Sequence, residues 1–137
     1  MSTTHEIVLT PVTTKVRFYT SVDNGSYIPS HWHRAIEIIY IQTGALTVTV
    51  ESHTQELTAG QCILINSNVV HSTQCTIPNT AIVFQIPLDF IETYIPQVRS
   101  LLFHLPEGSA DPKERTKLDI FKDTLEKMQI ANDMPVS

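Results

Sequence analysis

Short apolar runs separated by turn-forming residues follow one another along the first two thirds of the chain. Residues 46–50 alternate apolar and polar side chains, which is the two-residue period of a strand with one dry and one polar face. Turn-forming groups such as Asp23-Asn24-Gly25, Thr43-Gly44 and Pro78-Asn79 separate the runs. The pattern predicts a mostly β protein whose strand spacing suits a closed or two-layered antiparallel barrel. The predicted strands are 15–20, 30–41, 45–52, 55–57, 62–65, 71–76 and 80–86.

After Pro87 the apolar residues recur three and four apart, which predicts helices over 88–105 and 113–130. The second helix has a clear start: Asp111 can cap it, Pro112 suits its first position, and Glu114 can reach back to the cap. Its apolar stripe consists of Leu118, Phe121, Leu125 and Met128. The stripe could pack on the barrel or on the same helix of a second copy, and the sequence leaves both alternatives open.

Composition and charge then exclude several classes of protein. A chain of 137 residues fits one domain with its own hydrophobic core. The net charge of −5, without clustered Lys and Arg, argues against direct binding of nucleic acid. No apolar run approaches the roughly 18 residues that span a bilayer, and the first residues lack the pattern of a leader. Cys62 and Cys75 form no C-x-x-C pair, so we expect reduced thiols and a cytoplasmic protein.

The candidate chemistry lies within 25–44. If this segment is one extended strand, His31, His33 and Glu37 point to one face while Trp32 points to the other, unless a bulge turns it inward. Two imidazoles two residues apart can reach one cation, and a carboxylate can close the same side. We expect His71, after the turn that follows 62–65, to be the fourth member. The same groups could instead bind a sugar, an acid or water through hydrogen bonds.

These residues resemble the motifs of the cupin superfamily. The first cupin motif, with its intervals of five, three and six residues, is reproduced in full by Gly25, His31, His33, Glu37 and Gly44. The second is matched by Gly60 and His71, whereas Asn66, Asn68 and Cys75 occupy its proline, glycine and asparagine positions. The resemblance implies a cupin barrel, a double-stranded β-helix or jelly roll, followed by C-terminal helices. Complete cupin sites often hold iron, manganese, nickel or zinc, so it also implies a possible divalent metal.

Within the cupins, residues 31–50 and 59–72 resemble the N-terminal ligand-sensing domain of AraC-type transcriptional regulators. This resemblance implies an N-terminal arm over 1–14, a barrel over 15–90 and a helical dimerisation segment over 91–137. In that family, helix-turn-helix units further along the chain contact DNA, and these units are absent from the present sequence.

We therefore expect a binding domain that takes a small-molecule effector or a metal ion in the barrel and forms a homodimer. Its pocket would contain His31, His33, Glu37 and His71, with Arg17 and Tyr19 as further candidates, and no residue is assigned a catalytic role. The dimer would form through Leu118, Phe121, Leu125 and Met128. One alternative is a freestanding metal-dependent cupin enzyme of the dioxygenase or isomerase type. Another is a structural dimerisation domain with a vestigial site.

Overall fold

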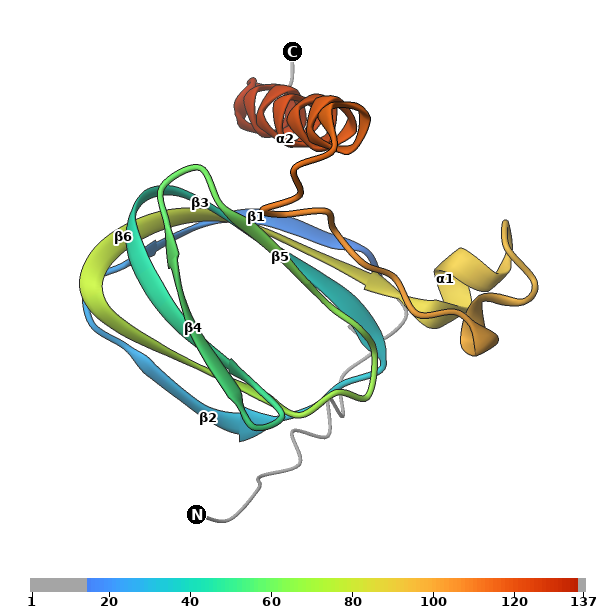
Figure 1. Cartoon of the computed structure of the whole chain (residues 1–137), viewed down its shortest axis with the longest axis horizontal. Coiled ribbons are helices and arrows are strands. Elements are labelled where there is room, and N and C mark those ends of the chain that lie inside the picture. The colour runs from blue at the N-terminus through green and yellow to red at the C-terminus, as the bar shows by residue number, and fades with distance from the viewer. Residues whose placement is uncertain (1–14, 136–137) are drawn as a thin grey trace.

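The computed structural model describes residues 15–135, and within them six strands form one antiparallel sheet that curls into a barrel (Figure 1). The strands run in the order β1-β6-β3-β4, with β2 also paired to β6 and β5 to β3. Their bounds are β1 Arg17–Asp23, β2 Tyr27–His31, β3 Ala35–Val50, β4 His53–Thr58, β5 Cys62–Ile65 and β6 His71–Pro87. The mostly β prediction is confirmed. The arm predicted over 1–14 lies outside the described residues.

The long strands β3 and β6 pair along nearly their whole length, from Ala35 opposite Pro87 to Val50 opposite His71. The sequence pattern predicts a turn within each of them, and this prediction is wrong. Thr43-Gly44 and Pro78-Asn79 lie opposite each other, where the register shifts and both strands bend. Gly44 has φ +76°, and a Cβ there would lie 2.0 Å from the Pro78 carbonyl oxygen. The turn-forming residues therefore mark a corner of the barrel, not the ends of strands.

The bend also changes which residues of β3 face inward. Before Gly44, Ile39 and Ile41 enter the inner core, and after it Leu46 and Val48 do so. A strand alternates faces with a period of two, so a bulge that adds a residue reverses the inward parity. The predicted single strand over 30–41 is likewise wrong, because residues 32–34 form a link between β2 and β3.

The predicted helix over 88–105 is also wrong as a continuous element. The structure has a short helix α1 at Leu88–Glu92 and a 3₁₀ turn η2 at Val98–Ser100, and residues 101–106 are neither helix nor strand. Pro96 has no N–H to continue a helix. Further along, the Asn66 side chain donates to the Phe103 carbonyl and accepts from the Phe103 amide, each at 2.9 Å. Asn66, the residue at the proline position of the second motif, thus holds residues 101–106 in a conformation that is neither helix nor strand.

The second predicted helix is confirmed as α2, Pro112–Asp133. The Asp111 carboxylate accepts from the Lys113 amide at 3.0 Å, as its capping role requires. The Asp111 amide donates to the Ser109 hydroxyl at 3.1 Å. Ser109, and not Glu114 as expected, therefore accepts the hydrogen bond from this amide. No helix in the described part of the chain is long and apolar enough to cross a membrane.

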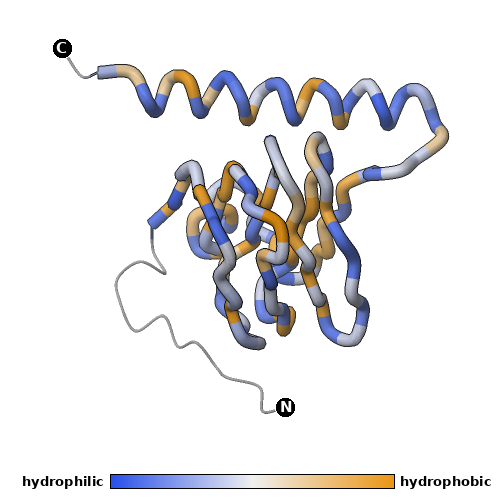
Figure 2. Tube along the Cα trace, turned by 90° about the vertical axis from the view of Figure 1, so that its left-hand side faces the viewer, coloured by the Kyte–Doolittle hydropathy of each residue, from blue (hydrophilic) through white to orange (hydrophobic). Residues whose placement is uncertain are grey.

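Helix α2 lies along the outside of the barrel, over β1 and β6 (Figures 1 and 2). Leu125 is only 1 % exposed and packs in a cluster with Ile38, Tyr40, Cys62 and Ile82. Leu118 is buried, whereas Phe121 and Met128 are half-buried. The Tyr40 hydroxyl donates to Glu126 at 2.8 Å, which adds a polar contact between helix and barrel. The chain's own barrel therefore occupies much of the apolar stripe.

Candidate metal centre

Three histidines from separate parts of the chain meet inside one end of the barrel. His31 ends β2, His33 lies in the link to β3, and His71 begins β6 directly opposite His31 in the β2–β6 ladder. All three are buried, and their ring centroids lie 4.2–5.8 Å apart. One ring nitrogen of each lies within 4.8 Å of the others. The fold thus brings together the histidines that the sequence had grouped, although residues 32–34 do not form the continuous strand expected.

Backbone carbonyls determine the tautomers of two of these rings. The Nδ1 atom of His31 lies 2.8 Å from the Pro29 carbonyl oxygen, and that of His71 lies 2.9 Å from the Val69 oxygen. A carbonyl oxygen can only accept, so Nδ1 carries the hydrogen in both rings. In the neutral form of each ring, Nε2 then carries the lone pair. This is the arrangement that second-shell hydrogen bonds give to imidazoles that bind metals.

His33 supplies a buried nitrogen without a hydrogen-bond partner. Its Nε2 atom makes no hydrogen bond within the described part of the chain, and the nearest Glu37 oxygen is 4.0 Å away. Burial lowers the pKa of His33, although the charge of Glu37 opposes this effect. The ring is therefore neutral near pH 7, with a lone pair available to a cation. A buried polar atom left unpaired costs about 1–3 kcal/mol, which a bound ion would offset.

Glu37 lies beside the histidines at an inward-facing position of β3. One of its oxygens is 3.2 Å from Nε2 of His71, and the other accepts a 2.6 Å hydrogen bond from the Gln85 side chain. Burial raises the pKa of Glu37, but the interaction with His71 and the hydrogen bond from Gln85 outweigh it, so the net pKa lies below its ordinary value. Glu37 is thus a carboxylate that can complete a ligand set or balance its charge.

Sequence reasoning missed Gln85. It lies directly opposite Glu37 in the β3–β6 ladder and faces inward, as Ala81 and Val83 do. Its carbonyl oxygen accepts from the Arg17 guanidinium at 3.3 Å while its amide group donates to Glu37. The signal was present in the sequence, because Gln85 is the one polar side chain within the otherwise apolar run 81–86.

The donor set fits a divalent transition metal. Neutral imidazole nitrogens with one carboxylate suit zinc, nickel, manganese or iron. A zinc–nitrogen bond is about 2.0–2.1 Å long. His31, His33 and His71 would hold the metal, with Glu37 at its side.

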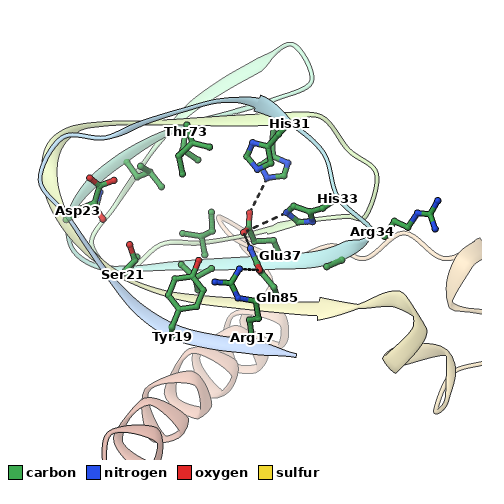
Figure 3. A pocket seen from close by; sticks show the side chains of 18 of the residues that line it. Arg17, Tyr19, Ser21, Asp23, His31, His33, Arg34, Glu37, Thr73 and Gln85 are labelled. Atoms are coloured by element: carbon green, nitrogen blue, oxygen red, sulfur yellow. Dashed lines mark hydrogen bonds and ion pairs between the residues drawn. The ribbon is translucent and has the colours of Figure 1, made fainter. Parts of the chain in front are cut away.

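The centre opens into a cavity of about 390 Å³, within the range of small-molecule sites (Figure 3). Tyr19 and Arg17, both expected in the pocket, line its wall on β1, and the guanidinium carbon of Arg17 lies 5.1 Å from the centre of the Tyr19 ring. Apolar side chains, among them Ile39 and Leu46, also line the cavity. Trp32 is not among the described residues that line the cavity, but strand parity does not account for this, because residues 32–34 are not part of a strand.

The fold and the site together define a β-barrel domain with a buried histidine cluster at its ligand cavity. The family described as Cupin domain matches residues 18–86, half of the chain. The chain therefore belongs to the cupin family, which confirms the broader of the two resemblances found in the sequence.

Several solved structures resemble the chain over about half its length. An RmlC-like cupin from Shewanella frigidimarina NCIMB 400 is 25 % identical over 53 % of this chain and 66 % of its own, with a TM-score of 0.49. KdgF from Halomonas sp. is 19 % identical over 53 % and 67 %, with a TM-score of 0.47. The DMSP lyase DddQ from Ruegeria pomeroyi DSS-3 is 28 % identical over 52 % and 38 %, with a TM-score of 0.47. The chain thus spans just under two thirds of the first structure and well under half of the lyase. No curated protein matches the chain.

Proposed function

We propose that this cupin domain holds a divalent metal through His31, His33 and His71 and takes a small-molecule ligand in the cavity beside it. The observation that carries the proposal is the buried Nε2 of His33, which has no hydrogen-bond partner among residues 15–135. It lies at the same end of the cavity as two histidines whose Nδ1 atoms donate to backbone carbonyls. When bound, the metal would supply a Lewis-acid centre that attracts a ligand oxygen. Gln85 would hold Glu37 in place, and the apolar wall would exclude water from the ligand.

We propose further that this is the effector-sensing and dimerisation domain of an AraC-type regulator, acting in the cytoplasm. The sequence resemblance over 31–50 and 59–72 supports this role. Strand β1 offers a physical link, because Arg17 and Tyr19 line the cavity while Phe18 on the opposite face packs into the cluster beneath α2. A ligand that moves β1 would thereby move the helix. DNA would be contacted only by a domain outside these 137 residues.

The homodimer in this proposal would use α2. Leu118 and Leu125 are buried in the protomer, so of the stripe only the half-buried Phe121 and Met128 are left for a partner. Association would then be weak in the single domain, because few large apolar side chains remain on that face.

A metal-dependent enzyme of the dioxygenase or isomerase type is the second candidate. The observation that favours it is the direct opening of the histidine cluster into the cavity, which would place a ligand atom next to the metal. Glu37, a buried carboxylate at the cluster, could then exchange a proton with a substrate.

The sensor and the enzyme both require a metal bound by the three histidines, and the metal content of the protein tests this requirement. Protein purified without a nickel column should contain about one equivalent of zinc, nickel, manganese or iron, and H33A should contain far less. Wild-type protein that stays metal-free after incubation with each ion would contradict the proposal. The sensor and the enzyme are then separated by the fate of a bound compound, because a sensor returns it unchanged and an enzyme returns a product.

A further inference from the structure

The charges around the cavity differ from those of the chain as a whole. The chain carries a net charge of −5, yet three of the cavity's lining residues, Lys15, Arg17 and Arg34, are basic. Among the described residues, none of these three has an ion-pair partner. In Figure 3 the Arg34 side chain extends away from the cavity, whereas Arg17 turns back along its wall. Arg17 is therefore the cation best placed to meet a ligand.

The two acidic lining residues already have partners. Asp23 accepts from the amide and the hydroxyl of Ser26 at the β1–β2 turn, and Glu37 is bound to His71 and Gln85. A divalent ion at the histidines would add two further positive charges. These hydrogen bonds leave the negative charges of Asp23 and Glu37 in place, so without the ion they offset the charges of Arg17 and Lys15. With the ion bound, the cavity would carry an excess of positive charge, whose complement is an anion.

Arg17 is exposed, and two contacts orient its side chain. Its Nη1 donates to Gln85, and its guanidinium lies over the Tyr19 ring, while its other N–H groups make no further hydrogen bond to the described residues. A guanidinium with N–H groups to spare presents a planar fork, which matches a carboxylate with two parallel hydrogen bonds. Stacking on Tyr19 and the bond to Gln85 reduce the entropy that such binding would lose.

We propose that the ligand of this barrel is a small carboxylate, bound through its carboxylate to Arg17, with Lys15 adding positive charge and the rest of the molecule directed along the apolar wall toward the histidines. This inference rests on the proposed function in taking the cavity as the ligand site. Arg17 is a ligand-binding and specificity-determining residue in this account. Gln85 is a positioning residue, since it joins Arg17 to Glu37.

The test uses benzoate and acetate as probes, with benzamide and acetamide as neutral analogues of the same shape and inorganic phosphate as a competing anion. Binding is followed by NMR through the Arg17 side-chain Nε–H signal and the backbone amides of Ala81 and Val83. We expect benzoate to produce a saturable shift with a Kd of about 1 mM or tighter, and benzamide to bind at least about tenfold more weakly. R17Q should weaken benzoate at least about tenfold, whereas R17K should lose less, because it keeps the charge without the fork.

R115Q on the exposed surface of α2 is the matched control and should bind benzoate as the wild type does. A dispersed amide spectrum identifies variants that remain folded. The proposal is overturned if neither carboxylate gives a saturable shift, if benzamide or phosphate binds as tightly as benzoate, or if R17Q leaves the affinity unchanged. The titration is run on chelator-treated and zinc-loaded protein. Carboxylate binding without zinc binding refutes the metal centre alone, and zinc binding without carboxylate binding refutes this inference alone.

Discussion

Gln85 donates a 2.6 Å hydrogen bond to Glu37 from the position directly opposite it in the β3–β6 ladder. The pair connects two strands and two functions, because Gln85 also binds Arg17 at the cavity wall and Glu37 also contacts His71. A buried carboxylate with fewer donors is harder to keep ionised. The position of Glu37 beside the histidines thus depends on a residue that no metal would touch.

Replacing Gln85 with Leu should therefore weaken metal binding by about 10–100-fold, the usual effect of losing a partner outside the ligand set. The pKa of Glu37 should rise because the hydrogen bond from Gln85, which helps to lower it, is lost. A competition titration with a chromophoric zinc chelator measures the affinity. Gln55→Leu on the exposed β4 strand is the matched control, and an equal affinity in Q85L and Q55L would show that Gln85 plays no positioning role.

Gly44 should tolerate no side chain. Gly44→Ala combines a left-handed φ with a Cβ 2.0 Å from the Pro78 oxygen, so it should destabilise the fold by about 3 kcal/mol or more. Gly108→Ala has a similar φ of +80° with open space around it and should cost only about 1–2 kcal/mol. Urea unfolding measures both values. Equal losses would mean that the barrel corner is looser than the Gly44–Pro78 contact implies.

The metal-free protein should lose stability in acid in two stages. Burial lowers the pKa of His33 from 6.5, so the unfolded chain takes up the proton first and stability falls as the pH drops below that value. The pKa of Glu37 is lowered from 4.5, so the unfolding free energy falls a second time as the pH drops below 4.5. Unfolding free energies measured between about pH 7.5 and 5.5 should decline less in H33Q than in the wild type. His53→Gln, on exposed β4, should leave the decline unchanged, and a parallel decline in H33Q would assign the first stage to another group.

Leu125→Ala should destabilise the protomer itself. The side chain is 1 % exposed in the cluster between α2 and the barrel, so its truncation should cost about 2–5 kcal/mol. The loss should be the same at low and high protein concentration, because the contact lies within one chain. Leu102→Ala, at an 86 % exposed position, should change little. A loss that appears only at concentrations where dimers form would place Leu125 in the interface between copies.

Local patterns in the sequence predicted much of this structure. Three features that depend on residues close together in the chain are present in the structure. They are the alternation in β3, the cap at Asp111 and the grouping of His31, His33 and Glu37. The failures have long-range causes. Thr43-Gly44 and Pro78-Asn79 have the composition of turns, and only their meeting across the ladder makes them a bend. Residues 101–105 have helical periodicity, but their backbone is bound by Asn66 from a distant loop. Gln85 acquires its role through a cross-strand pairing that no short motif contains.

The central claim is that the three histidines form one metal site, and an isothermal titration of chelator-treated protein with zinc tests it most directly. We expect a single site of about one zinc per chain that vanishes in H31A, H33A and H71A and persists in H53A. Zinc at about 100 times its Kd should also raise the unfolding free energy of the wild type by about 2.7 kcal/mol and that of H33A by far less. Zinc binding that survives H33A unchanged, or its absence from the folded wild type, would contradict the account.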